Sequence, residues 1–319
     1  MIYIFINTTS AGQAALKKWR QVELILQEQA INYRPIFTAG IAELTQQLKE
    51  IATLQTSETA HIQLVSAGGD GSLHTLINKI FQIFSEPQRK RIKLGAINLG
   101  SSNDFHKPYH KLLKGHSLRM STQSTAYDVG RCRMINETGE SKETLFLVNA
   151  SIGLTAQGNY IFNTNPIVQH FKKINFNVAN FCTLLLLLKN ISHQQFFLEL
   201  ITSEGETIVF DEIMSNMGIL KTPNVSGGMN FGTPVQRNDR LLDFVFTKKI
   251  NIGQLFSLFI KLHKGAFLND KNSGFHSINS IKVSSLTPFL LEMDGEIMEP
   301  VREAFFDLHP QTIQVCEAL

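Results

Sequence analysis

Two glycine-bearing turns carry the residue types that could bind a phosphate. The first is Gly68-Gly69-Asp70-Gly71-Ser72, which lies between an apolar run at 62–66 and a helical pattern. Glycines let the backbone turn tightly and approach a ligand, because no Cβ intervenes. A helix that begins in such a turn points free N–H groups and its positive dipole end at a bound anion. The alternative is an ordinary turn in which Asp70 or Ser72 only caps the helix.

The second turn is Gly100-Ser101-Ser102-Asn103-Asp104-Phe105, which follows another apolar run. Ser101 can donate to a phosphate oxygen, and Asn103 and Asp104 could shape the loop or hold a metal-bound water. Their alternative role is to bond the local backbone of a turn. If both turns follow strands of one parallel sheet, they lie side by side at its carboxyl edge, where ligands bind in open α/β sheets.

A third group of polar residues is Asp294-Gly295-Glu296. A carboxylate within hydrogen-bond reach of an acceptor hydroxyl can take its proton. Taken alone, these three residues are more typical of a tight hairpin turn with exposed acids.

The elements that must position these residues change in kind along the chain. The first half alternates apolar strands, at 2–6, 35–38, 62–66 and 93–97, with amphipathic helices around 15–26, 44–51 and 73–81. This alternation predicts a parallel sheet covered on both faces. After about Asp128 the pattern predicts mostly antiparallel β structure, with a hairpin at 196–210 and one helix, about Val178 to Asn190. A last strand, 312–316, could pair with either domain.

Composition supports a globular chain of two domains. The chain has 319 residues, 43% hydrophobic and 18% charged, and no leader segment is predicted at its N-terminus. A net charge of +3 does not indicate nucleic acid. Residues 105–119 carry four basic side chains and no acid, which suits phosphates or an anionic lipid surface. The apolar run 181–188 is too short to span a bilayer and predicts a buried helix.

These motifs resemble, in order along nearly the whole chain, those of the diacylglycerol kinase catalytic-domain family, which includes soluble bacterial lipid kinases and sphingosine kinases. The matching segments are Asn7 to Gly12, Thr38, Gly68 to Ser72, Asn98 to Phe105, Gly227 to Met229 with Asp239 to Asp243, and Asp294 to Glu296. Two prolines of the family pattern are Thr8 and Asn98 here, which is expected to loosen their loops. Arg240 replaces a glycine and would be strained if its φ were positive.

The resemblance implies a role for each matching position. The nucleotide site would comprise Thr38, Gly68, Gly69, Asp70, Gly71, Ser72, Leu73, His74, Gly100, Ser101, Asn103 and Asp104. A structural Mg²⁺ would be held by the Asp239 side chain and the backbone carbonyls of Gln236 and Leu241. The catalytic residues would be Glu296 as proton acceptor, Asp294 beside it, and Asp70.

The implied fold is an α/β N-terminal domain at 1–128, with a parallel sheet similar to those of NAD kinase and phosphofructokinase. Residues 300–319 could complete it. A mostly antiparallel β domain at 129–299 would take the lipid. The implied activity is ATP- and Mg²⁺-dependent phosphorylation of a lipid hydroxyl. The three cysteines, none of them in a C-x-x-C pair, predict a cytoplasmic protein. Because no span is predicted and a lipid must be reached, peripheral membrane contact is expected, and an unpaired edge strand could mediate a homodimer. No partner among nucleic acids is expected.

Two other functions stay open. The chain could be a different kinase with a G-G-D-G turn, although the N-x-G-x-L-G-F motif expected of NAD kinase is not found. It could also bind lipid or nucleotide without catalysis, which the altered prolines and Arg240 allow.

Overall fold

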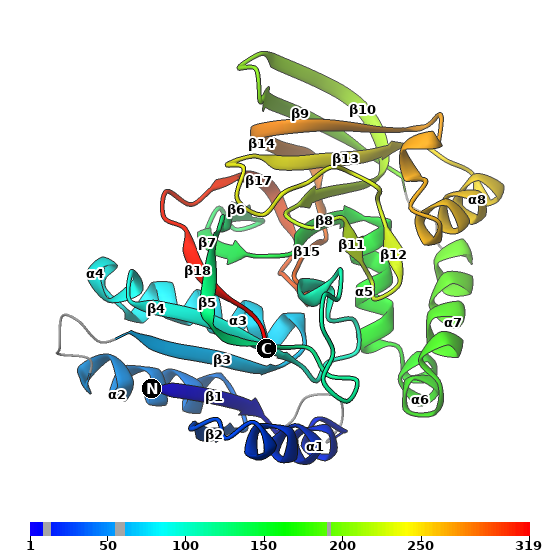
Figure 1. Ribbon diagram of the computed structural model, residues 1–319. Coiled ribbons are helices and arrows are strands. Elements are labelled where there is room, and N and C mark those ends of the chain that lie inside the picture. The colour runs from blue at the N-terminus through cyan, green and yellow to red at the C-terminus, as the bar shows by residue number, and fades with distance from the viewer. Residues whose placement is uncertain (9–13, 55–60, 190–192) are drawn as a thin grey trace. The chain divides into compact units, whose positions relative to one another are not determined.

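The computed structural model describes residues 1–8, 14–54, 61–189 and 193–319 (Figure 1). Residues 9–12 of the predicted opening motif lie outside the described residues. The chain divides into two compact units, Met1–Val129 with Pro310–Leu319, and Gly130–His309.

The first unit contains a six-stranded sheet in the order β18-β5-β4-β3-β1-β2. Its strands are β1 (Ile2–Asn7), β2 (Arg34–Thr38), β3 (Ile62–Gly68), β4 (Ile92–Asn98), β5 (Leu118–Tyr127) and β18 (Ile313–Ala318). The run from β2 through β1 and β3 to β4 is parallel. All seven residues of β3 are buried, so both faces of the sheet are covered there, as the sequence pattern predicted.

The helices of this unit are α1 (Ala14–Glu28), α2 (Ile41–Leu54), α3 (Asp70–Ile83) and α4 (Glu86–Arg89). Helix α1 buries Trp19, Val22 and Leu26 against the face from which Ile4 and Ile6 project. This contact follows from the spacing of three and four residues between the apolar positions of α1. Helix α3 starts directly after Gly69, so the first glycine turn forms its N-terminus.

Strand β18 belongs to the first unit, which settles the pairing that the sequence left open. It pairs antiparallel with β5 and parallel with β4. Ile313, Val315 and Cys316 of β18 are buried, and burial raises the pKa of the Cys316 thiol to about 11.

The second unit contains a ten-stranded sheet in which the strand pairs are antiparallel. Its strands are β6 (Gly130–Asn136), β7 (Ser141–Phe146), β8 (Asn149–Gly153), β9 (Gln194–Thr202), β10 (Thr207–Leu220), β13 (Leu242–Lys248), β14 (Ser273–Phe289), β15 (Leu291–Met293), β16 (Glu296–Ile297) and β17 (Val301–Leu308). A separate hairpin pairs β11 (Asn224–Val225) with β12 (Met229–Asn230). The predicted hairpin is confirmed as β9–β10.

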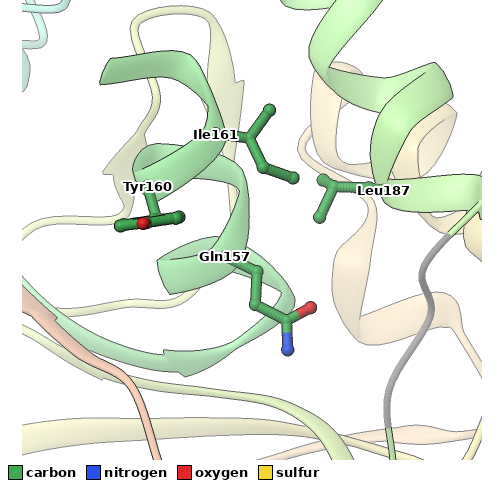
Figure 2. Close-up of a pocket in the computed structure, with 4 residues that line it drawn as sticks. All are labelled: Gln157, Tyr160, Ile161 and Leu187. Carbon is green, nitrogen blue, oxygen red and sulfur yellow. The ribbon is translucent and has the colours of Figure 1, made fainter. Parts of the chain in front are cut away.

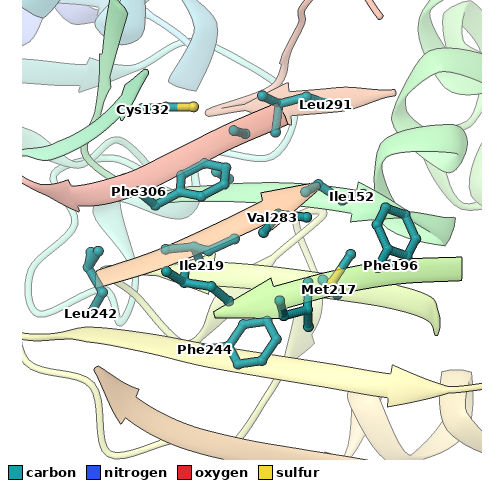
Figure 3. Packing of buried hydrophobic residues seen from close by; sticks show 14 of the residues in the cluster. Cys132, Ile152, Phe196, Met217, Ile219, Leu242, Phe244, Val283, Leu291 and Phe306 are labelled. Atoms are coloured by element: carbon teal, nitrogen blue, oxygen red, sulfur yellow. The ribbon is translucent and has the colours of Figure 1, made fainter. Parts of the chain in front are cut away.

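The larger core cluster of the second unit is formed by side chains from the strands of this sheet (Figure 3). Along β9 the burial alternates residue by residue, so Phe196, Leu198 and Leu200 point into the core. Phe306 of β17 and Phe244 of β13 pack in the same cluster. The predicted fold class, a mostly parallel α/β part followed by antiparallel β structure, is confirmed.

The prediction of a single helix in the second half was wrong. The described residues of this half form four α-helices: α5 (Leu154–Thr164), α6 (Pro166–Ile174), α7 (Phe176–Lys189) and α8 (Ile252–His263). Two of the missed helices have N-terminal signals in the sequence. Asn165 caps α6 ahead of Pro166, and Asn251 forms a capping box with Gln254 in α8.

Helix α7 is also not the buried helix that its apolar sequence predicted. Ala179 and Leu184 are buried, whereas Phe181 is 56% and Leu185 49% exposed. Helix α7 therefore packs against the second unit with one face and leaves apolar side chains of another face exposed to solvent.

Candidate active site

Four strand ends meet at the carboxyl edge of the first sheet. In the parallel ladders Asn7 lies opposite Thr38, and Gly68 lies opposite Asn98. Strand β1 sits between β2 and β3, so the chain order reverses beside it. Such a switch point is where open α/β sheets bind ligands.

The two glycine turns at this edge touch each other through their backbones. A Cβ at Gly100 would lie only 2.3 Å from Gly69 Cα, and a Cβ at Gly69 would lie 3.2 Å from Gly100 Cα. The N–H groups of Leu99 and Gly100 both donate to the Gly68 carbonyl oxygen, at 2.9 and 3.1 Å. The structure therefore brings the two predicted phosphate-binding turns into one surface that only glycine permits.

Asp70 joins the two turns through its carboxylate. It is the first residue of α3, and its two oxygens accept the backbone N–H groups of Asp104 and Phe105 at 2.9 and 3.0 Å. Through this contact Asp70 orients the second turn relative to the start of α3.

The second turn is further shaped by its own side chains. Asn103 has a left-handed backbone with φ of 52°. Its amide oxygen accepts from Gly100 N–H and its amide nitrogen donates to Gly100 O, both at 3.0 Å. The buried Asp104 carboxylate accepts from Lys107 Nζ at 2.7 Å. Ser101, in contrast, is exposed at the tip of the turn.

The other predicted nucleotide residues differ in accessibility. Ser72 lies partly exposed in the first turn of α3, where its hydroxyl is near the helix N-terminus. Leu73 and His74 are buried, as is Thr38. Leu73 and His74 therefore belong to the packing of α3 more than to a ligand surface.

At the positions of the two lost prolines, Thr8 and Asn98 make hydrogen bonds. Thr8 donates to the Thr38 carbonyl oxygen from both its backbone N–H, at 3.0 Å, and its hydroxyl, at 3.2 Å. The Asn98 side chain accepts from Ser117 N–H at 2.8 Å. A proline could make neither the Thr8 N–H bond nor the Asn98 contact.

Lys18 is a residue of this site that the sequence analysis missed. Its ammonium, on α1, donates to the carbonyl oxygens of Leu99 and Gly100, both at 3.1 Å. Burial lowers the pKa of this ammonium. The only signal was a lysine on the first helix of an α/β unit, and its partner loop lies more than eighty residues away in sequence.

The basic residues between 105 and 119 do not form one continuous face. Lys107 pairs with Asp104, and Lys114 pairs with Glu28. Arg119 is buried with its guanidinium over the Phe105 ring. Lys111 is exposed.

In the second unit, the Asp294–Glu296 turn is tightly held. The Asp294 carboxylate is buried and accepts the backbone N–H groups of Leu147, Val148 and Asn149, at 3.0, 2.8 and 3.1 Å. Asp294 has a left-handed φ of 50°. Its charge therefore positions the turn.

Two further side chains that the sequence analysis missed hold the same turn. Buried Glu292 accepts from the Ser151 hydroxyl and from Gly295 N–H. Asn159 of α5 donates to the Gly295 carbonyl oxygen at 2.9 Å. Glu296 itself is exposed, and in the described part of the chain no hydrogen bond or ion pair engages its carboxylate.

At the loop predicted to hold a structural Mg²⁺, the ammonium of a lysine from outside the loop contacts the predicted ligand groups. Lys221 Nζ donates to Asp239 Oδ1 at 3.0 Å and to the Leu241 carbonyl oxygen at 2.7 Å. These are two of the three predicted ligand groups, and the third residue, Gln236, is exposed. Among the described residues no three acidic, histidine or cysteine side chains converge as metal ligands. The residues present therefore do not fit the implied ion.

Two residues near this loop, Arg240 and Asp243, have an unusual backbone conformation and a shifted pKa respectively. Arg240 has φ of 63°, the left-handed conformation that the missing glycine implied. Burial raises the pKa of Asp243 to about 6, an effect that the Asp239 charge increases and the Lys221 charge opposes.

Two adjoining glycine turns on a mostly parallel sheet, followed by an antiparallel β unit, define the fold class of this chain as α/β with a second β-rich unit. Residues 1–132 match the sequence model of the diacylglycerol kinase catalytic domain, which is a kinase domain, so the resemblance to that family is confirmed.

Relatives extend this similarity over most of the chain. A diacylglycerol kinase of Bacillus subtilis strain 168 is 21% identical over 92% of this chain and 88% of its own length. A diacylglycerol kinase of Staphylococcus haemolyticus is 23% identical over 79% of this chain and 70% of its own. The solved structure of a proposed diacylglycerol kinase from Bacillus anthracis covers 99% of this chain and 94% of its own, with a TM-score of 0.69 at 16% identity. That structure supports the fold.

Proposed function

We propose that this protein is an ATP-dependent lipid kinase that transfers the γ-phosphate to a lipid hydroxyl group. The observation that carries the proposal is the contact between the two glycine turns, Gly69 against Gly100, at the carboxyl edge of the first sheet. The match of residues 1–132 to a diacylglycerol kinase catalytic domain supports the same reaction class.

The nucleotide would bind to the first unit. The glycine backbones give the phosphates close access, and the N-terminus of α3 favours their negative charge. The Ser72 and Ser101 hydroxyls can donate to phosphate oxygens. Lys18 places a positive charge at the second turn. Mg²⁺ would enter with ATP and neutralise charge on its phosphates.

Glu296 would act as the general base. Its exposed carboxylate is free to accept the lipid hydroxyl proton as that oxygen bonds to the γ-phosphorus. The bond to the β–γ bridging oxygen then breaks, and ADP leaves. Asp294, Glu292 and Asn159 would act as positioning residues, because each holds the backbone of the turn that carries Glu296.

The lipid chain would contact α5 and α7. A pocket of about 270 Å³ between these helices is lined by Gln157, Tyr160, Ile161 and Leu187 (Figure 2). Its walls are mostly apolar, as an acyl chain requires. Three of the four lining residues lie on α5, the same helix whose Asn159 holds the Glu296 turn. A lipid in this pocket would therefore have its polar end near that turn.

Helices α6 and α7 would bring the protein to the membrane surface. Ile167, Ile174, Phe181 and Leu185 are exposed on them. Residues 144–198 contain lysines but no acidic residue, so this apolar surface would meet anionic headgroups without repulsion. In the described residues no helix is both long and apolar enough to cross a bilayer. The contact would therefore be peripheral.

The test is transfer of labelled γ-phosphate from ATP with Mg²⁺ to vesicles of mixed hydroxyl lipids, with NAD offered in a parallel reaction. We expect labelled lipid and no labelled NADP. Glu296→Gln should lower the transfer rate by about 10²- to 10⁴-fold while ATP still binds, because general-base catalysis typically contributes that factor.

Glu299→Gln is the matched control, since Glu299 is an exposed acid three residues further on, and it should transfer at the parent rate. A parent rate for Glu296→Gln would remove Glu296 from the mechanism. ATP binding without any phosphorylated product would contradict the lipid kinase and favour a binding protein.

A further inference from the structure

We propose that the buried ammonium of Lys221, and not a divalent cation, holds together the loop that leads into β13. The proposal concerns the folded chain without nucleotide or lipid, so it stands or falls independently of the proposed kinase activity.

Lys221 directly follows β10 and is almost completely buried, with 1% of its surface exposed. A lysine is seldom buried to this degree unless its charge is paired. Its backbone N–H donates to the Val148 carbonyl oxygen at 2.9 Å, which anchors the residue between β10 and the start of β8. The side chain thus starts from a rigid position in the sheet.

The ammonium bonds to the residues on both sides of Arg240. Nζ donates to Asp239 Oδ1 at 3.0 Å and to Leu241 O at 2.7 Å. Asp239 Oδ1 also accepts from Leu241 N–H at 3.1 Å. The two neighbours of Arg240 are therefore joined through one lysine, which accounts for a non-glycine residue staying at a φ of 63°.

A divalent ion and this ammonium cannot share these oxygens. Mg²⁺ requires its oxygen ligands at about 2.0–2.1 Å in near-octahedral geometry. An ion at that distance from Asp239 Oδ1 and Leu241 O would lie against Nζ, which is within 3.0 Å of both atoms, and the like charges would repel. The lysine supplies the cation and three hydrogen-bond donors from within the chain.

The consequence is a loop whose stability does not depend on metal. A site built from Asp239 and carbonyl oxygens alone would be stabilised by added Mg²⁺, because binding to the folded state raises its stability. The Lys221 site should show no such effect.

The experiment is thermal unfolding of the full chain, without nucleotide, in EDTA and in millimolar MgCl₂. We expect the wild-type Tm to be the same in both. Lys221→Met keeps the apolar stem and removes the charge, which leaves the Asp239 carboxylate without its partner. Its Tm should fall by about 5 °C, since the half-buried Asp239 carboxylate and the Leu241 carbonyl oxygen both lose the ammonium that donates to them.

Lys221→Ala adds a second arm, because it also removes the side chain that fills the site. If it folds, its Tm should be low in EDTA and rise in MgCl₂, and Asp239→Asn in the same background should abolish that rise. Lys248→Met is the matched control: Lys248 pairs with Glu212 in the same unit but is 44% exposed, and its loss should change Tm little.

Two results would overturn the proposal, and both can be obtained without the alanine variant. One is a wild-type Tm that rises in MgCl₂ and no longer does so in Asp239→Asn. The other is a Lys221→Met protein as stable as Lys248→Met.

Discussion

At the scale of single residues, the candidate site depends on two glycines, Gly69 and Gly100, whose lack of a Cβ lets the two turns meet. Gly69 and Gly100 approach so closely that a methyl group on Gly100 would overlap Gly69 Cα. The two turns are also joined by backbone hydrogen bonds to the Gly68 carbonyl oxygen. Backbone atoms cannot move aside for an added methyl group as the end of a flexible side chain could. Asp70 then holds the second turn by two N–H groups.

Gly100→Ala should therefore separate the two turns. We expect a loss of stability of about 1–3 kcal/mol, as for overpacking in a tight core, and at least a tenfold weaker ATP affinity by calorimetry. Gly40→Ala is the control, because a Cβ there meets nothing within 4 Å. Equal ATP affinity in Gly100→Ala and Gly40→Ala would show that the contact does not matter for nucleotide binding.

At the scale of elements, a strand from the end of the chain completes the first sheet. Strand β18 pairs with β4 and β5, whose ends carry the second glycine turn and Ser117. Its buried side chains contribute to the first unit although more than 180 residues separate them from β5. The stability of the two glycine turns should therefore depend on β18.

Ile313→Ala should destabilise the first unit by about 2–5 kcal/mol, since Ile313 is 1% exposed in its core. Hydrogen exchange should become faster in β4 and β5 while β13 in the second unit is unchanged. Glu317→Ala, on the same strand but exposed, should have little effect. Faster exchange in β13, or an unchanged exchange rate in β4, would contradict the assignment of β18 to the first unit.

Helix α7 carries two exposed apolar side chains, Phe181 and Leu185, which would contact a membrane surface. Replacing Phe181 and Leu185 together by serine removes exposed apolar area without touching the buried Ala179 and Leu184. Binding to anionic vesicles, measured by sedimentation, should fall about tenfold or more with no loss in Tm.

The control for α7 is Leu24→Ser, because Leu24 is 59% exposed on α1 and should leave vesicle binding unchanged. If the α7 variant sedimented with vesicles as the parent does, α7 would not be the membrane contact.

At the scale of the whole molecule, local patterns predicted the elements of the first unit and the strands of the second better than the second unit's helices or the long-range contacts. The βα alternation of the first half and the change to antiparallel strands were visible in residue periodicity. The adjacency of the two glycine turns followed from their strands being parallel neighbours. Lys18, Glu292 and Lys221 were missed because each contacts a residue elsewhere in the chain. Residue periodicity does not show which distant residues the fold brings together.

The positions that depart from the family pattern were also only partly predictable from sequence. From sequence, Thr8 and Asn98 read only as missing prolines, whereas the structure gives each a hydrogen bond that replaces the lost constraint. Arg240 indicated a strained residue correctly, but the lysine that stabilises it lies 19 positions earlier in the sequence. Helices α6 and α8 were missed because Asn165 and Asn251 resemble loop residues until they are recognised as N-caps.

If both glycine turns bind one nucleotide, hydrogen exchange with and without ATP and Mg²⁺ should show it in both turns at once. We expect the backbone amides of residues 68–73 and 99–105 to be slowed together at the same ATP concentration, with 294–297 unchanged in the absence of lipid. Slowing of only one turn, or of neither at saturating ATP, would contradict a shared nucleotide site.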